Sequence, residues 1–188
     1  MNTKFIAFCA VSLDGFLARE NGKLDWLEAS ADKESTEDYG YQKFLRAMDC
    51  IVMGRNTFEK VASFAQWPYV DKRVIVLSKK MQQIPSAFED KISLFSGKVE
   101  ELVVDLQSRG YKHIYIDGGK TIQSFIRAGV MDELIITQIP ILINKGLPLF
   151  AEFSHDIKLK LTRSQSYPSG FVQSRYDIEH QSRYYDGE

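Results

Sequence analysis

The chain has 188 residues, with 24 lysine and arginine residues against 25 aspartate and glutamate residues and a net charge of −1. This balance gives no electrostatic reason to expect nucleic acid or an anionic membrane as a partner, and no apolar run approaches the length of a membrane-spanning helix. With 44% hydrophobic residues, the chain is long enough to bury the core of one globular domain.

The two cysteines, Cys9 and Cys50, lie in apolar, strand-like runs and form no C-x-x-C motif. Together with an N-terminus that lacks a secretory pattern, they favour free thiols in a reducing compartment. We therefore expect a cytoplasmic protein with a single domain over residues 1–180 and a short tail over residues 181–188.

The first half of the chain alternates apolar runs with segments at helical spacing, which predicts alternating strands and helices. A nearly continuous apolar run over residues 4–11 indicates a strand buried on both faces. The elements expected next are a long loop over 12–26, a helix over 34–48, a strand over 50–53, a helix that starts near Thr57 from a capping box of Asn56 and Glu59, and strands over 73–77 and 92–95.

The second half predicts more of the same alternation and then an antiparallel pair. Its expected elements are a helix over 99–109, a strand over 113–116, a helix that stops at Gly129, a strand over 133–142, a loop over 144–150, and a hairpin at about 159–178 with one wet face. This order indicates an α/β fold with a mostly parallel central sheet of about eight strands flanked by helices, and a C-terminal antiparallel hairpin.

Two adjacent glycines, Gly118 and Gly119, join the strand at 113–116 to the following helix. A turn of this kind frees backbone N–H groups at a helix N-terminus, where the peptide dipoles favour an anion. We hypothesise that this glycine pair holds the phosphates of a dinucleotide. A P-loop is excluded because Ile114 stands where that motif needs glycine, and the chain has no G-x-G. An ordinary tight turn is the open alternative.

Loops after residues 11, 53, 77 and 116 all leave the carboxyl ends of predicted strands. Ligands of open α/β sheets bind outside these ends. We therefore expect the four loops to build one shared site.

The order of motifs resembles the dihydrofolate reductase-like family. It is most similar to the reductase domain of bifunctional riboflavin-biosynthesis enzymes and to their stand-alone bacterial relatives. The motifs that carry the resemblance are S-L-D-G at 12–15 with D-W-L at 25–27, M-G-R-N-T at 53–57, L-S-K at 77–79, D-G-G at 117–119, and the stretch over 140–150.

The resemblance implies NADPH as cofactor. The cofactor would be bound by Gly54, Arg55, Thr57, Leu77, Ser78, Lys79, Gly118, Gly119, Lys120 and Thr121. Arg55, Ser78 and Lys79 match positions that receive the 2′-phosphate, and two cations with a hydroxyl suit a dianionic group. A lid segment would pack on the nicotinamide through Leu17, Ala18, Asn21 and Gly22. The alternative for these residues is a solvated surface or an ordinary turn.

The implied activity is hydride transfer to a C=N or C=O bond of a small pteridine- or pyrimidine-like ring. An apolar pocket for the ring would be lined by Phe5, Trp26, Phe44 and Phe58, and Thr137 matches the threonine that supports the acid of folate reducers. Folate reducers keep a carboxylate five residues beyond the lid tryptophan, where this chain has Ala31. Asp14, and then Asp32 or Glu28, are the candidate proton donors, and burial would raise the pKa of the donor.

Two other functions stay open. The chain could be a non-catalytic NADPH-binding or regulatory module, or an α/β domain that binds a different phosphate. His113, His155 and His180 lack metal-ligand spacing, so we expect no metal site. The resemblance further implies a homodimer.

Overall fold

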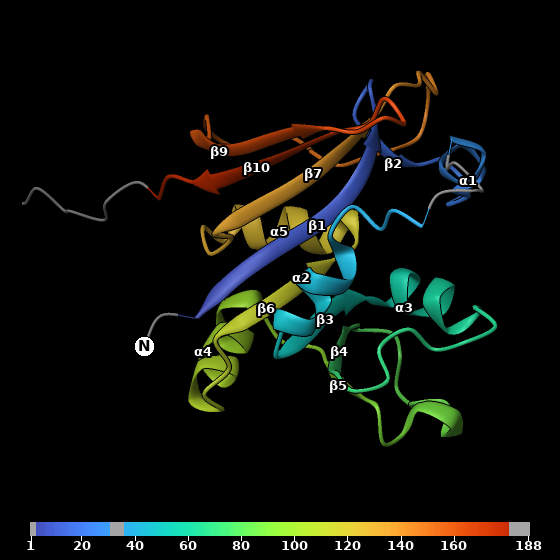
Figure 1. Cartoon of the computed structure of the whole chain (residues 1–188). Coiled ribbons are helices and arrows are strands. Elements are labelled where there is room, and N and C mark those ends of the chain that lie inside the picture. The colour runs from blue at the N-terminus through green and yellow to red at the C-terminus, as the bar shows by residue number, and fades with distance from the viewer. Residues whose placement is uncertain (1–2, 31–35, 181–188) are drawn as a thin grey trace, which may run out of the picture.

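In the computed structural model, residues 3–30 and 36–180 are described, and they form an eight-stranded sheet with helices on both faces (Figure 1). Strands β5, β4, β3, β6, β1 and β7 run parallel in this order, and β10 and β9 continue the sheet antiparallel. The predicted sheet, including its C-terminal hairpin, is therefore confirmed.

The strands are β1 (Lys4–Ser12), β2 (Phe16–Ala18), β3 (Cys50–Gly54), β4 (Arg73–Leu77), β5 (Ile92–Phe95), β6 (His113–Asp117), β7 (Glu133–Ile139), β8 (Leu147–Pro148), β9 (Leu159–Ser166) and β10 (Val172–Ile178). The helices are α1 (Asp25–Ser30), α2 (Tyr41–Ala47), α3 (Arg55–Ala62), α4 (Val99–Ser108) and α5 (Gly119–Arg127), with a 3-10 turn η1 (Ser86–Phe88). Strands β2 and β8 form a separate small ribbon.

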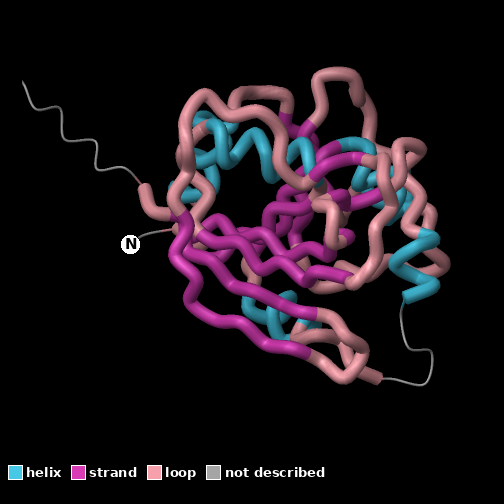
Figure 2. Tube along the Cα trace, turned by 90° about the horizontal axis from the view of Figure 1, so that it is seen from above, coloured by secondary structure: helices cyan, strands magenta, loops and turns pink. Residues whose placement is uncertain are grey.

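The central strands are apolar on both faces because helices cover both (Figure 2). On one face, called here the front face, α2 and α3 pack through Leu45, Phe58 and Val61. On the other, α4 and α5 pack through Leu102 and Phe125. In Figure 1, α2 lies in front of the sheet and α5 behind it. No described helix is long and apolar enough to cross a membrane.

Two helix starts differ from the prediction. The helix expected over 34–48 is only Tyr41–Ala47 in the described part of that range, because Tyr39 and Gly40 have φ angles of 54° and 80° and cannot continue it. The capping box expected at Asn56 was wrong. Helix α3 starts earlier, at Arg55, which puts Asn56 inside the first turn.

Two strand predictions also need correction. β7 ends at Ile139 rather than residue 142, because Pro140 follows and has no N–H for the ladder. The hairpin was predicted to expose one face to solvent and to bury the other, which carries Leu159 and Leu161. These two side chains on β9 are nevertheless 40% and 55% exposed. β9 is the outer strand, and no helix of the described chain covers it.

Candidate active site

Two loops at the carboxyl edge of the sheet pack together through glycine and threonine residues. β3 and β6 are paired strands, so the loops that follow them are neighbours. A Cβ on Gly118 would collide with the side chain of Thr57, and a Cβ on Gly54 would lie 3.1 Å from Oγ1 of Thr121. Gly118 also has a φ of 89°. Both its backbone and its surroundings therefore require glycine.

Each of these loops leads into a helix whose first turn lacks a side-chain cap. Helix α3 follows Gly54 and helix α5 follows Gly118, and neither of these N-cap residues makes a side-chain hydrogen bond to its helix. The first N–H groups of both helices are therefore available to an anion, and the two helix dipoles favour one there. Two such ends side by side fit a pyrophosphate.

A pocket of about 540 Å³ lies at the end of strand β4, whose Leu77 is paired with Gly54. Leu77, Ser78 and Lys79 line it together with residues 96–100 after β5 and with Ser124 and Arg127 of α5. The charged side chains of this lining are the three cations Lys79, Lys98 and Arg127 and one carboxylate, Glu100. A pocket of this size and charge fits a nucleoside that carries a phosphate.

Arg55 does not line this pocket. Its guanidinium donates to Oε1 of Glu59 at 3.0 Å along the surface of α3. Oγ of Ser78 accepts the N–H of Met81 at 2.9 Å, which leaves the hydroxyl hydrogen of Ser78 for a ligand. Ser78 and Lys79 are therefore better placed than Arg55 for an extra phosphate.

The lid segment, residues 16–22, lies over the glycine pair. Strand β2 pairs with β8, and Cδ1 of Leu17 is 2.7 Å from where a Cβ on Gly119 would stand. Ala18 is buried. Asn21 and Gly22 form the turn beyond the strand, where the Asn21 side chain accepts the N–H of Lys23. Leu17 is therefore the lid residue that lies against Gly119.

Gln123 ties helix α5 to the loop that carries β8. This side chain is 8% exposed, and its Nε2 donates to the carbonyls of Pro148 and Leu149, both at 3.1 Å. Because β8 pairs with β2, helix α5 and the lid segment are connected through one amide.

Asp14, the first candidate proton donor, holds two loops together instead. It accepts from Oγ of Ser12 at 2.5 Å and from the N–H groups of Ile143 and Asn144 at 3.1 and 2.8 Å. The Ser12 hydrogen bond is the main reason why the pKa of Asp14 is lowered. The expectation of a raised pKa is thus wrong, and an ionised carboxylate is a poor proton donor.

We expect the Asp14→Asn substitution to lower the melting temperature at neutral pH, because an amide replaces the ionic acceptor of three donors. The pKa of Asp14 is lower in the folded protein than in the unfolded chain, where it is about 4, so the ionised carboxylate stabilises the fold above about pH 4. This contribution is lost as the pH falls through the pKa of the folded protein. Thermal unfolding from pH 7 to pH 3 should therefore show the two proteins converge at low pH. A constant gap across this range would contradict the assignment.

The other two carboxylate candidates are not supported. Glu28 is exposed to solvent on α1 rather than enclosed in a pocket. Asp32 lies outside the described residues.

A different carboxylate, Asp117, has the expected environment. It ends β6 directly before the glycine pair, and Oη of Tyr69 lies 3.4 Å from its Oδ2. Burial raises its pKa, although the nearby Tyr115 hydroxyl, which itself donates to the carbonyl of Phe8 at 3.1 Å, the Gly118 N–H and the Tyr69 hydroxyl act in the opposite direction. Tyr41 on α2 interacts with both other tyrosines. Burial raises the pKa of all three phenols, so each stays protonated at neutral pH.

The apolar residues predicted around the ring do not share one pocket. Phe5 faces α5 and packs on Phe125 with ring centroids 5.4 Å apart, on the far side of the sheet from the other three. Phe58 is buried beneath α3. Trp26 is 2% exposed, and its buried Nε1 has no hydrogen-bond partner in the described chain. Phe44 alone lies with the tyrosines, 5.1 Å from the Tyr115 ring. The prediction that Phe5 lines this pocket was wrong.

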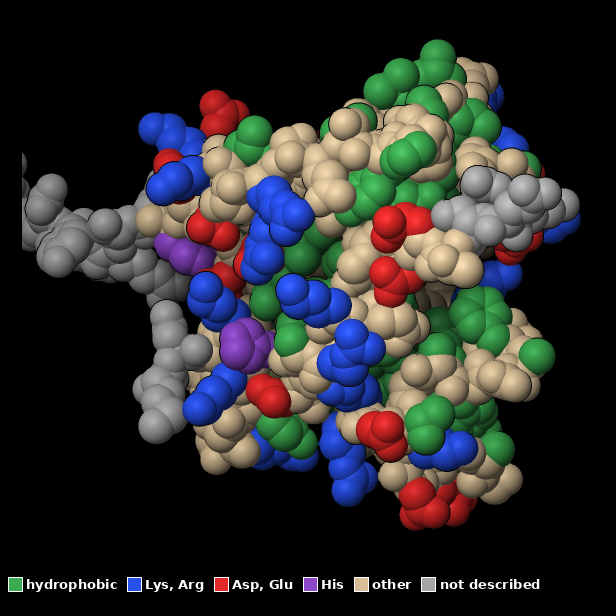
Figure 3. Space-filling view, in the orientation of Figure 1, with side chains coloured by type: hydrophobic (Ala, Val, Ile, Leu, Met, Phe, Trp, Pro, Cys, Tyr) green, Lys and Arg blue, Asp and Glu red, His purple; other side chains and the backbone are tan. Residues whose placement is uncertain are grey.

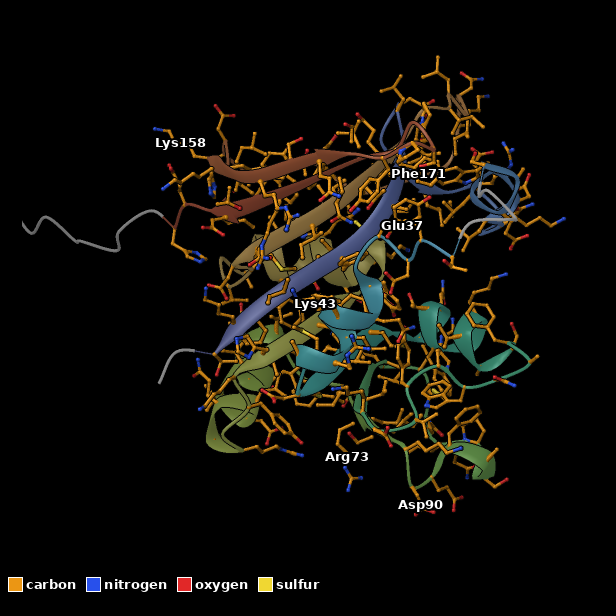
Figure 4. The ribbon with its side chains drawn as sticks, viewed as in Figure 1. Glu37, Lys43, Arg73, Asp90, Lys158 and Phe171 are labelled. Atoms are coloured by element: carbon orange, nitrogen blue, oxygen red, sulfur yellow. The ribbon has the colours of Figure 1, made fainter. Side chains whose placement is uncertain are left out.

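Thr137 lies on the front face and is 4% exposed. Its Oγ1 accepts from Nε2 of Gln173 at 3.0 Å, and the same nitrogen donates to the carbonyl of Tyr39 at 3.0 Å. Tyr39 in turn stacks on Phe171 with centroids 5.1 Å apart. Figure 4 shows Phe171 at the hairpin tip, above the segment of Glu37 that leads into α2.

The sequence analysis therefore did not identify Asp117, the three tyrosines and Gln173 as members of this front-face cluster. Asp117 had a usable signal, since it stands at a strand end immediately before the glycine pair. Tyr69 and Gln173 had none, because only the tertiary fold brings them to this face. Lysine and arginine side chains also gather on this face (Figure 3), which the net charge of −1 conceals.

Residues 3–173 match the family described as the RibD C-terminal domain. A crystal structure from Shewanella sp. PV-4, named for riboflavin biosynthesis, is 39% identical, with a TM-score of 0.89 over 94% of this chain and 99% of that one.

Two further solved structures share the fold. A Thermotoga maritima protein, named as a diaminohydroxyphosphoribosylaminopyrimidine deaminase and 5-amino-6-(5-phosphoribosylamino)uracil reductase, is 14% identical. Its TM-score is 0.72 over 95% of this chain and 57% of that one. A dihydrofolate reductase of Enterococcus faecalis, complexed with NADP(H), is 16% identical, with a TM-score of 0.64 over 94% of this chain and 96% of that one. The dihydrofolate reductase-like fold is therefore confirmed.

Proposed function

Because the chain belongs to the family of the RibD C-terminal domain, we propose that it is an NADPH-dependent reductase. Its substrate would be a small pyrimidine- or pteridine-like ring with a reducible C=N or C=O bond. The observation that carries the proposal is the pair of uncapped helix N-termini at the ends of the paired strands β3 and β6, with a pocket lined by Lys79, Lys98 and Arg127 at the end of the next strand, β4.

The cofactor end of the site has a donor set that fits NADPH. The first turns of α3 and α5 would bind the pyrophosphate through backbone N–H groups. Ser78 and Lys79 would bind the 2′-phosphate at the pocket after β4. When bound, NADPH supplies the hydride, and the protein supplies orientation and a proton.

Asp117 would hold that proton on the front face. Its raised pKa keeps the carboxyl group protonated to higher pH than an exposed aspartate. The protonated tyrosines beside it cannot act as bases at neutral pH, but they can donate hydrogen bonds that fix the carboxyl group. Proton transfer to the ring nitrogen or oxygen would accompany reduction.

The proposal predicts a preference for NADPH over NADH. We expect calorimetry to show at least about tenfold tighter binding of NADPH, equivalent to about 1.4 kcal/mol. The Lys79→Gln substitution should reduce this ratio, because it removes a cation from the pocket. Lys80→Gln is the matched control, since Lys80 is the next residue and is not among those that line the pocket.

Equal affinity for the two dinucleotides would contradict the 2′-phosphate assignment, and the absence of NADPH binding would contradict the proposed function as a whole. A similar loss of preference in both lysine variants would show a general surface-charge effect rather than a specific contact.

A non-catalytic NADPH-binding module is the second candidate. It is favoured by the structural use of Asp14 and the exposure of Glu28, which leave Asp117 as the proton donor to be tested. Tight NADPH binding without oxidation across a pyrimidine and pteridine panel would support this second candidate. The homodimer and the cytoplasmic location stay predictions.

A further inference from the structure

The Thr137–Gln173 pair and Asp117 share the front face of the sheet. Thr137 is paired with Ala10 of β1 and with Gln173 of β10, so the three side chains point to the same side. Phe8, two residues before Ala10, packs on Tyr41 of α2 with ring centroids 5.4 Å apart. Strand β1 separates β6 from β7, and Asp117 is level with Phe8 while Thr137 is level with Ala10. Two strand spacings and a two-residue offset place the Cα atoms of Asp117 and Thr137 about 12 Å apart. A small heterocycle over Ala10 would reach both.

The hydrogen bonds fix which way the Gln173 amide points. The carbonyl oxygen of Tyr39 can only accept a hydrogen bond, so the atom 3.0 Å from it must be the amide nitrogen. Both hydrogens of this nitrogen are then used, one by Tyr39 and one by Oγ1 of Thr137. The orientation of Gln173 is therefore determined by its neighbours.

Two hydrogen-bonding groups of the Thr137–Gln173 pair have no partner in the described chain. Oε1 of Gln173 has no partner among residues 3–30 and 36–180, and it is not one of the fully buried unsatisfied atoms of this region. The hydroxyl hydrogen of Thr137 likewise has no acceptor in the described chain. The pair thus offers one acceptor and one donor, and it carries no charge.

A lactam edge of a ring, N–H beside C=O, offers one donor and one acceptor and therefore complements this pair. The edge of a protonated 2,4-diaminopyrimidine offers donors only and needs a carboxylate. Folate reducers set their threonine beside a carboxylate, whereas here the partner of Thr137 is a neutral amide.

We propose that Gln173 is the residue that determines ring specificity, reading a neutral lactam edge together with Thr137 and rejecting cationic diaminopyrimidines. This inference rests on the proposed reductase function. It adds which residue recognises the ring and which hydrogen-bonding groups the ring edge carries.

The test uses 6-aminouracil and 2,4-diaminopyrimidine as two small ligands, titrated by calorimetry with and without saturating NADPH. We expect wild type to bind 6-aminouracil more tightly. Gln173→Glu should reverse the order, with each affinity changing by about tenfold, because a carboxylate beside Thr137 suits the cation. Gln165→Glu is the matched control, since it puts the same charge on the paired position of β9, one strand further out.

Thr137→Val provides a second measurement if Gln173→Glu is unstable. It removes the free hydroxyl donor and keeps the volume, so 6-aminouracil affinity should fall while 2,4-diaminopyrimidine affinity does not rise. The inference is overturned if wild type binds neither ring, binds both equally or prefers 2,4-diaminopyrimidine, or if the order is unchanged in folded Gln173→Glu. NADPH binding is titrated separately in every variant, so its loss in wild type would count against the reductase function alone.

Discussion

Replacing Gly118 with alanine is expected to weaken NADPH binding by at least about tenfold, or about 1.4 kcal/mol. The residue has a φ of 89°, where a side chain costs about 1–2 kcal/mol. A Cβ would also collide with Thr57, whose side chain packs between the two loops. Relief of both strains would displace the N-terminus of α5 from the phosphates. Calorimetry with NADPH measures the affinity, and thermal unfolding measures the loss of stability.

Gly110→Ala is the matched control for this experiment. Gly110 has a similar φ of 78°, but a Cβ there would meet nothing within 4 Å. This variant should lose about 1 kcal/mol of stability from backbone strain and keep its NADPH affinity. If both variants bind NADPH like wild type, the glycine pair is only a tight turn.

The Asp117→Asn substitution is expected to lower turnover by about 10²- to 10⁴-fold, the usual contribution of a general acid. Asparagine has nearly the same shape, so NADPH affinity should not change. The measurement is NADPH oxidation with a substrate identified from the pyrimidine and pteridine panel. Asp14→Asn is the control, because its carboxylate binds backbone N–H groups rather than facing the tyrosines.

The pH dependence of turnover gives a second view of the same residue. The pKa of Asp117 is raised by burial, and the acid must carry its proton to donate it. The rate should therefore fall as pH rises through this pKa, and the fall should vanish in the residual activity of Asp117→Asn. A falling limb that persists in the variant would assign it to another group.

Local sequence signals were sufficient for most of the fold. Buried parallel strands such as β3 and β4 are continuous apolar runs between polar loops, so their pattern depends little on tertiary context. The start of α2 was missed because two successive residues, Tyr39 and Gly40, adopt positive φ angles, which periodicity does not reveal. The exposure of β9 was missed for a related reason. Its alternation describes a half-buried strand, but at the edge of the sheet its Leu159 and Leu161 stay exposed.

The candidate site was predictable on its cofactor side and much less so on its substrate side. The glycine pair and Ser78–Lys79 follow strand ends directly, so position in the sequence fixes position in space. The acid was harder, because a pKa depends on burial and partners that the sequence does not show. Asp14 and Asp117 both precede glycine, yet one faces backbone N–H groups and the other a cluster of phenols.

The amide of Gln123 links helix α5 to the lid segment, so binding at the N-terminus of α5 is expected to stabilise the pairing of β2 with β8. A dinucleotide bound at the N-terminus of α5, as proposed, would contact a helix that this side chain joins to Pro148 and Leu149. Their strand β8 is the only ladder partner of Phe16–Ala18 in the described sheets. Amide hydrogen exchange in Phe16–Ala18 should therefore slow when the cofactor binds, and cutting the link with Gln123→Leu should leave those amides exchanging at the unliganded rate.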